Sequence, residues 1–170
     1  MKRRQWIGGT AAAAVLLLGA GALYQLRGDT PPDDPYRFRV LDDEERAILA
    51  AIGPVMLAGA LPAGGTGTNA FIEGFDTAVA GLPPHVQGEL AQLFMLLKNG
   101  VLRVLATGVM HPWHEASQEE IARFLTAWRY SGIVKLRAGY DALHQLTLAA
   151  WYGNPVSWSA IGYPGPPVVR

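Results

Sequence analysis

Two histidines three residues apart are the strongest candidates in this sequence for metal or proton chemistry. The segment His111-Pro-Trp-His114 can place two imidazoles on one side of a turn, and Glu115 is the nearest carboxylate. A zinc site needs three or four ligands in a fixed shell, whereas Glu115 is adjacent to His114 and is not offset for joint coordination. We therefore expect this segment to form a loop before a helix that begins at Ser117, with metal binding as the alternative.

The other ionisable and glycine patterns give weaker signals. Asp141 and His144 lie three apart in a helical pattern, where such a pair is usually a surface hydrogen bond, and His85 follows two prolines as a first-turn surface residue. The sequence has no phosphate-binding G-x-x-x-x-G-K-[ST] and no G-x-S-x-G. It has no cysteine, which excludes thiolate metal sites and iron–sulfur clusters. We expect no catalytic residue, no metal site and no cofactor-binding site in this chain.

The N-terminus has the pattern of an export leader. Lys2, Arg3 and Arg4 precede an uncharged run rich in Ala, Gly and Leu, and the arginine pair indicates a twin-arginine signal over residues 1–22. Ala20-Gly21-Ala22 provides a cleavage signal, with an uncleaved anchor as the alternative. Twin-arginine export carries folded proteins, often with a cofactor or partner. We expect the translocation machinery as one partner and a location at the periplasmic face of the inner membrane.

The composition behind the leader suits one domain. The whole chain has 14 basic and 14 acidic residues, and loss of residues 1–22 leaves 11 basic and 14 acidic residues. No basic stripe remains to neutralise phosphates, so we expect no nucleic-acid partner. Residues 23–40 are proline-rich and polar, and we expect them to form a linker.

Residues 41–152 show helical periodicity throughout and no strand-like alternation. Capping residues and prolines predict helices that begin at Asp42, at Thr68 or Asn69, at Pro84, at Ser117 and near Ile133. Gly53-Pro54 predicts a kink or break, Lys98-Asn99-Gly100 a helix end, and Val101 to Ala106 either a short helix or a strand. The predicted fold is an all-α, orthogonal bundle of about five helices.

Residues 153–170 form a tail rich in proline, glycine and aromatic residues. We expect no helix beyond about Asn154 and an extended path after it. The aromatic side chains carry more apolar area than a solvated tail needs, so they pack on their own domain or on a partner. The candidate partner-binding residues are Trp151, Tyr152, Asn154, Pro155, Trp158, Ile161, Tyr163, Pro164 and Pro166.

The twin-arginine leader, the Asp42-Asp43-Glu44-Glu45-Arg46 helix start and the WYGNP…W…IGYPGPP tail together resemble one family. The chain resembles the gluconate 2-dehydrogenase subunit 3 family, the small (gamma) subunits of membrane-bound flavin dehydrogenase complexes. The resemblance implies a flavoprotein large subunit of the glucose–methanol–choline (GMC) class that carries FAD, and a multihaem cytochrome c subunit that carries haem. It implies that the small subunit holds no redox centre and serves export, folding and assembly of the flavoprotein.

The expected function is therefore that of a non-catalytic subunit of a periplasmic alcohol, sugar or sugar-acid dehydrogenase. Two alternatives remain open on the sequence. One is a stand-alone periplasmic enzyme or metal binder that uses His111, His114 and Glu115. The other is a membrane-anchored periplasmic interaction module without a redox partner.

Overall fold

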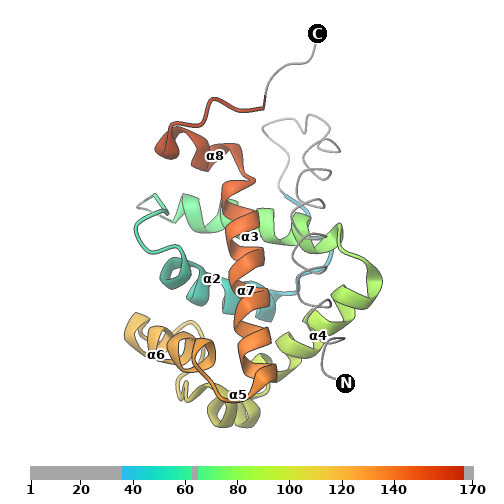
Figure 1. Cartoon of the computed structure of the whole chain (residues 1–170), viewed down its shortest axis with the longest axis vertical. Helices are drawn as coiled ribbons and strands as arrows, with labels where there is room; N and C mark the ends of the chain where they lie inside the picture. The colour runs from blue at the N-terminus through green and yellow to red at the C-terminus, as the bar shows by residue number, and fades with distance from the viewer. Residues whose placement is uncertain (1–35, 63–64, 167–170) are drawn as a thin grey trace, which may run out of the picture.

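The computed structural model describes residues 36–62 and 65–166, and within these ranges the chain is all-α (Figure 1). The leader with Arg3 and Arg4, most of the linker and the last four residues lie outside the described residues. The described part contains seven α-helices and one 3₁₀ helix, and no strand. They are α2 (Asp43–Met56), α3 (Thr66–Ala80), α4 (Pro84–Lys98), α5 (Gly100–Thr107), α6 (Gln118–Arg129), α7 (Val134–Tyr152), α8 (Pro155–Trp158) and η1 (Ser159–Ile161).

The first predicted helix start is confirmed. Asp42 caps α2 by accepting a hydrogen bond from the Glu45 amide, and the Glu45 carboxylate accepts one from the Asp42 amide in return. The predicted break at Gly53-Pro54 is wrong, because α2 continues to Met56. Pro54 lies in the last turn, where its missing N–H removes only one helical hydrogen bond. Gly53 is needed for packing, since a Cβ there would come within 2.4 Å of the Phe71 ring.

Two further boundaries differ from expectation. Helix α3 begins at Thr66 and not at Thr68 or Asn69, because Gly65 adopts a left-handed backbone at the cap position (φ 83°). Helix α4 ends at Lys98 as predicted, but the Asn99 side chain accepts a hydrogen bond from the Leu102 amide and starts α5 at once. The segment that the sequence left open as helix or strand is therefore helical.

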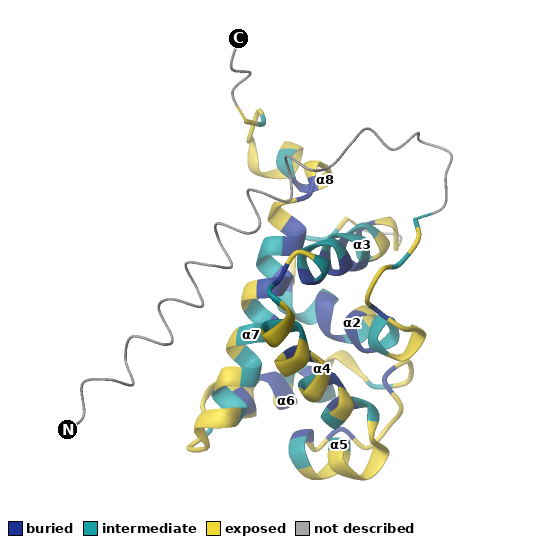
Figure 2. Ribbon diagram, turned by 90° about the vertical axis from the view of Figure 1, so that its right-hand side faces the viewer, coloured by how far each residue is buried: buried dark blue, intermediate teal, exposed yellow. Residues whose placement is uncertain are grey.

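The core lies between α7, which runs along the long axis of the molecule, and the helices α2, α3 and α6 that pack against it (Figures 1 and 2). Helix α3 makes the most extensive contact with α7. The two backbones approach closely at Gly74, where a Cβ would meet the Ala150 carbonyl oxygen at 2.6 Å. At the other end of the core Phe124 packs edge-to-face against both Trp113 and Trp128. These contacts leave α8 at one end of the molecule and α5 at the opposite end (Figure 1).

A buried carboxylate fixes the point where the chain enters the domain. Asp76 on α3 is fully buried and accepts hydrogen bonds from the amides of Arg39, Val40 and Leu41 at 2.9–3.0 Å and from the Tyr36 hydroxyl at 2.8 Å. Burial alone would raise the pKa of Asp76, but these four donors outweigh it, so that its pKa lies below the ordinary value. Burial, together with the neighbouring carboxylate, raises the pKa of Tyr36 to about 12.

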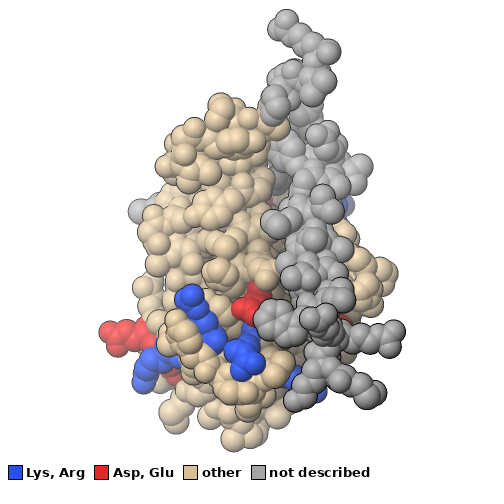
Figure 3. Space-filling view, in the orientation of Figure 1, with Lys and Arg blue, Asp and Glu red and all other residues tan. Residues whose placement is uncertain are grey.

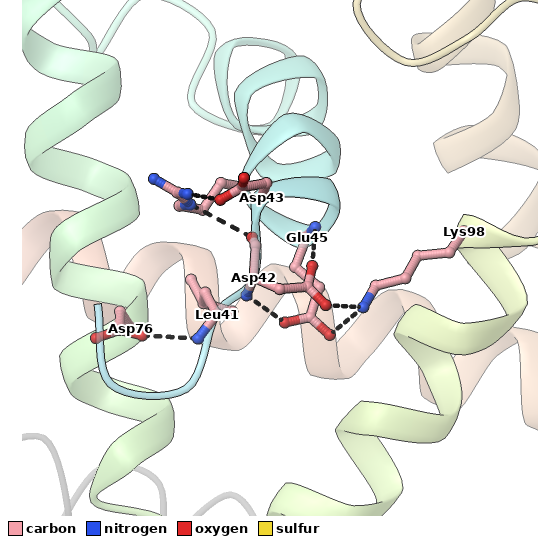
Figure 4. A network of polar contacts seen from close by, with 7 residues as sticks. Leu41, Asp42, Asp43, Glu45, Asp76 and Lys98 are labelled. Atoms are coloured by element: carbon pink, nitrogen blue, oxygen red, sulfur yellow. Dashed lines mark hydrogen bonds and ion pairs between the residues drawn. The ribbon is translucent and has the colours of Figure 1, made fainter. Parts of the chain in front are cut away.

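A second polar network joins α4 to the start of α2 (Figure 4). The Lys98 ammonium lies 2.5 Å from Asp42 Oδ2 and 2.8 Å from Glu45 Oε1. Burial would lower the pKa of Lys98, but the two carboxylates outweigh it and raise that pKa. The hydrogen bond from Lys98 in turn lowers the pKa of Asp42. The capping box of α2 is therefore also a tertiary contact.

Candidate functional site

The two histidines of the loop between α5 and α6 have different carboxylate partners. His111 Nδ1 lies 3.1 Å from Glu120 Oε2, and His114 Nε2 lies 3.3 Å from Glu115 Oε1. Both imidazoles are largely exposed. Among the described residues there is no group of three or more His, Cys, Asp or Glu side chains that could hold a metal ion. Each histidine has its own carboxylate, and the geometry does not form a metal shell.

Glu120 lies in the first turn of α6 and links this helix to the preceding loop. Ser117 caps α6 as predicted, with its hydroxyl accepting a hydrogen bond from the Glu120 amide at 3.2 Å. The Glu120 carboxylate turns to the preceding loop, where it accepts a hydrogen bond from the Met110 amide at 2.7 Å besides its contact with His111. The Met110 amide is the main cause that lowers the pKa of Glu120, and His111 adds to it. This cluster closes the loop onto α6.

Asp141 and His144 lie one turn apart on α7. In the described part of the chain no hydrogen bond or ion pair joins them, and the His144 ring stacks on Tyr140 at 5.5 Å between centroids. His85 is an exposed residue in the first turn of α4, as expected. In residues 36–62 and 65–166 no single helix is long and apolar enough to cross a membrane. Helices α4 and α5 together meet the length and composition limits, but the chain bends by 95° between them.

The C-terminal segment is folded where the sequence predicted an extended tail. Helix α8 begins directly after Asn154, whose side chain accepts a hydrogen bond from the Val156 amide, and Pro155 occupies the first helical position. The prediction that no helix follows Asn154 is wrong because Asn at the cap and Pro at the first position both start helices. The Asn154 side chain also donates to the Ala70 carbonyl at 3.1 Å and attaches α8 to α3.

Trp158 organises the residues that follow. Its indole N–H donates to the Tyr152 carbonyl at 3.0 Å, and its carbonyl accepts from the Tyr163 amide at 2.9 Å. The rings of Trp158 and Tyr163 pack edge-to-face at 5.2 Å. The chain reverses at Gly162, which has a left-handed backbone (φ 68°). The half-buried Trp158 therefore holds the segment in one shape.

The candidate partner-binding residues separate into buried and exposed groups. Trp151 is 1% exposed in the core and Asn154 is 6% exposed, so in this structure neither is accessible to a partner. The assignment of these two residues to a docking surface is corrected, since both hold the domain together. The exposed members are Tyr152, Pro155, Ile161, Tyr163, Pro164 and Pro166. Val156, which is 53% exposed, was missed by the sequence analysis and joins them.

We name Tyr152, Val156, Ile161 and Tyr163 the C-terminal apolar surface. All four side chains are at least 40% exposed, and they lie on one short segment around the half-buried Trp158. Removal of the Trp158 side chain takes away the ring that packs against Tyr163, whereas the bond between their backbones does not depend on that side chain. The surface is therefore apolar, aromatic and held in place before any partner arrives.

Two long uncharged stretches of the sequence meet at this end of the described domain. No Lys, Arg, Asp or Glu occurs in the sequence from residue 142 to 169 or from residue 47 to 72. The fold brings described parts of these two stretches together through the contacts of α7 with α2 and α3 and of Asn154 with Ala70. On the face drawn in Figure 3 the region over α8 and the upper half of α7 is uncharged, whereas Lys, Arg, Asp and Glu side chains appear lower down. The two uncharged stretches are visible in the sequence and indicate this end of the molecule. Helical periodicity alone does not indicate it.

Comparisons of the chain with protein-family models, with curated proteins and with solved structures find no match.

Proposed function

We propose that this chain is the non-catalytic small subunit of a periplasmic flavin-dependent dehydrogenase complex and assists export, folding and assembly of the flavoprotein subunit. The observation that carries the proposal is the C-terminal apolar surface, which is preformed and lies where two uncharged stretches of the sequence meet. Contiguous exposed apolar side chains of this kind are typical of protein–protein interfaces, and aromatic residues are enriched at interface centres. The leader and the tail motif add the resemblance to gluconate 2-dehydrogenase subunit 3.

The absence of charge favours a permanent interface. A charged side chain that is buried by a partner loses its hydration, which costs several kcal/mol unless it is paired. Residues 142–166 carry no such side chain, so a partner can cover α8 and η1 without that penalty. A complex that crosses a membrane in the folded state needs an interface that survives transit, and an apolar interface meets this need.

The proposal assigns the chemistry to other subunits. FAD belongs to the GMC-type flavoprotein and haem to a multihaem cytochrome c, and this chain contributes the twin-arginine leader with Arg3 and Arg4. We also propose that the helices of the domain pack orthogonally and that a signal helix precedes the domain. The oxidised substrate is an alcohol, sugar or sugar acid that meets the flavoprotein.

The leader supplies the first test. We expect the double variant Arg3→Lys with Arg4→Lys to leave both this chain and its flavoprotein in the cytoplasm, because the flavoprotein crosses only while bound to this leader. The measurement is fractionation of cells into cytoplasm and periplasm, with flavin fluorescence and immunodetection of both chains. Export of the flavoprotein with the lysine leader would contradict the escort role, and a chain that isolates without any flavoprotein would favour the interaction-module alternative.

The surface supplies the second test. We expect Ile161→Asp to weaken the complex by about 10- to 30-fold, since it places an unpaired charge in the proposed interface. Leu105→Asp is the matched control, because Leu105 is also an exposed apolar residue but lies on α5 at the opposite end. The readout is the amount of flavoprotein that co-purifies per molecule of this chain after whole cells are solubilised in detergent, so that any change in membrane attachment does not alter it. Equal losses in the two variants would show that the C-terminal apolar surface is not the specific contact.

A further inference from the structure

The end of the molecule opposite α8 carries a second exposed apolar surface. Helix α5 is rich in apolar residues, yet Thr107 is its one buried residue. Val101 is 70% and Leu105 78% exposed, and Met110 in the following loop is 73% exposed. An amphipathic helix normally turns its apolar stripe to the core. Here α5 is held by the hydrogen bond from Trp128 Nε1 to the Ala106 carbonyl, at 2.7 Å, and presents apolar side chains outward.

The loop between α6 and α7 adds a separate apolar protrusion at the same end. Tyr130, Ile133 and Val134 are each at least 60% exposed. Figures 1 and 2, which view the molecule from directions 90° apart, both place this loop and α5 at the lower end. The Arg137 guanidinium donates to the Ser131 carbonyl and fixes the loop against α7. A flat partner can contact both protrusions at once. Two fixed protrusions therefore suit such a partner better than a single groove or ridge on this chain would.

Basic residues outnumber acidic residues by five to three in residues 99–140, which run from α5 to the first turns of α7. Residues 99–114 and 121–140 contain no Asp or Glu, and their basic residues are Arg103, Arg123, Arg129, Lys135 and Arg137. The three acidic residues between the two stretches are Glu115 and Glu119, which are exposed, and Glu120, which is engaged by Met110 and His111. Arg129 lies over the Tyr130 ring at 5.4 Å, which places a cation next to an exposed aromatic side chain. The C-terminal apolar surface has no such basic surround.

We propose that α5 and the α6–α7 loop rest on an anionic bilayer surface, with Val101, Leu105, Ile133 and Val134 in the boundary between headgroups and acyl chains. Exposed apolar side chains flanked by Tyr, Arg and Lys are the composition of interfacial membrane contacts. The basic residues complement the negative headgroups. This contact goes beyond the proposed function, because it orients the domain with the C-terminal apolar surface pointing away from the membrane.

The test uses the absence of cysteine in the chain. Single variants Leu105→Cys, Val134→Cys and Val156→Cys of the full chain carry an environment-sensitive fluorophore, and Val156→Cys at the opposite end is the matched control. Each is reconstituted with vesicles of phosphatidylethanolamine and phosphatidylglycerol, with and without nitroxide-labelled lipids as quenchers. We expect blue-shifted, quenched emission at positions 105 and 134 and aqueous, unquenched emission at position 156. The leader is the same in all three chains, so binding through it cannot produce this difference.

Charge is tested on the same labelled chains. We expect two changes to raise the lipid concentration that gives half-maximal quenching at positions 105 and 134 by about tenfold. One is the additional double substitution Arg129→Gln with Lys135→Gln, and the other is the use of neutral phosphatidylcholine vesicles. The reason is that each basic residue adds to the attraction of an anionic surface. Equal quenching in neutral and anionic vesicles would overturn the role of the basic residues.

Three other results would overturn the membrane contact itself. They are aqueous emission at positions 105 and 134 on vesicles, shielding of these positions that rises with protein concentration without lipid, and shielding by a co-purified flavoprotein but not by vesicles. The second result would assign the surface to another copy of the chain and the third to the partner. No flavoprotein is needed for the vesicle measurement, so failure of this inference and failure of the proposed function give different results.

Discussion

Replacing Asp76 by alanine is expected to lower the free energy of unfolding by about 3–4 kcal/mol. Three backbone amides and the Tyr36 hydroxyl donate to the Asp76 carboxylate, and the Leu41 amide among them is buried. Removal of the carboxylate leaves these donors without their acceptor. A hydrogen bond to a charged group is worth about 1.5–3 kcal/mol, and coupled bonds do not add fully. The measurement is urea unfolding followed by tryptophan fluorescence.

Two conservative variants separate charge from shape at this site. Asp76→Asn keeps the volume and one acceptor oxygen, and we expect it to lose about half as much stability as the alanine variant. Tyr36→Phe removes one of the four donors and is expected to cost about 1 kcal/mol. A loss below about 1 kcal/mol for Asp76→Ala would contradict the role of Asp76 as the attachment point of residues 36–41.

The same contact makes stability depend on pH. Because the pKa of Asp76 is lower in the folded chain than its ordinary value of 3.8, its contribution is complete above that value and is lost as the pH falls below it. Asp42, whose pKa is lowered by Lys98, acts in the same direction but is exposed, so its share is small. We expect the urea concentration at the unfolding midpoint of the native chain to decrease as the pH is lowered below about 4. We expect the midpoint of Asp76→Asn to change less over the same range.

Trp151→Ala is expected to lower the free energy of unfolding by about 3–5 kcal/mol, as large aromatic truncations in a core do. The side chain is 1% exposed at the end of α7 and belongs to the main core cluster. Trp158→Ala is expected to cost less stability, because the Trp158 side chain is half-buried whereas that of Trp151 is buried in the core. Its main effect is to release the segment that carries Ile161 and Tyr163, and so to weaken partner binding.

The pair of tryptophan variants therefore distinguishes a core residue from a residue that organises the proposed docking surface. Unfolding is followed by circular dichroism, so that loss of a tryptophan does not change the probe, and partner binding by co-purification of the flavoprotein at a temperature where both variants are folded. If Trp151→Ala left stability unchanged and abolished binding, the assignment of Trp151 to the core would be wrong.

Local signals predicted the helices well because each cap depends on residues close in sequence. The reciprocal bonds of Asp42 and Glu45 and the Ser117 cap follow from spacing alone. The prolines misled in one respect. Pro155 was interpreted as a helix breaker, although the same residue after Asn154 is a helix start, and both outcomes follow from known rules. Whether Pro155 ends or starts a helix depends on whether α8 can pack against the rest of the domain, and this is a property of the tertiary structure.

The tertiary contacts had weaker signals. Asp76 lies between Phe75 and Val79 on the buried face of α3, and a carboxylate there predicts a set of donors but not which ones, since Tyr36 is 40 residues away. Trp151 follows Leu143 at eight residues, on the apolar stripe of α7, so periodicity places it in the core. The tail motif instead led to the prediction that Trp151 binds a partner. Sequence could not show that α5 is exposed, because buried and exposed apolar helices have similar composition.

The dependence of the core on α7 has a consequence for synthesis of the chain. Helix α3 finds its main packing partner in α7, and the bonds from Asn154 to Ala70 and from Thr147 to Met56 span 84 and 91 residues. Contacts between distant segments close late, after the entropy of the intervening loop has been overcome. The ribosome therefore releases the N-terminus long before the domain can collapse around its last long helix. A nascent chain whose N-terminal residues have left the ribosome still has an open core, and folding is completed only after translation has passed α7.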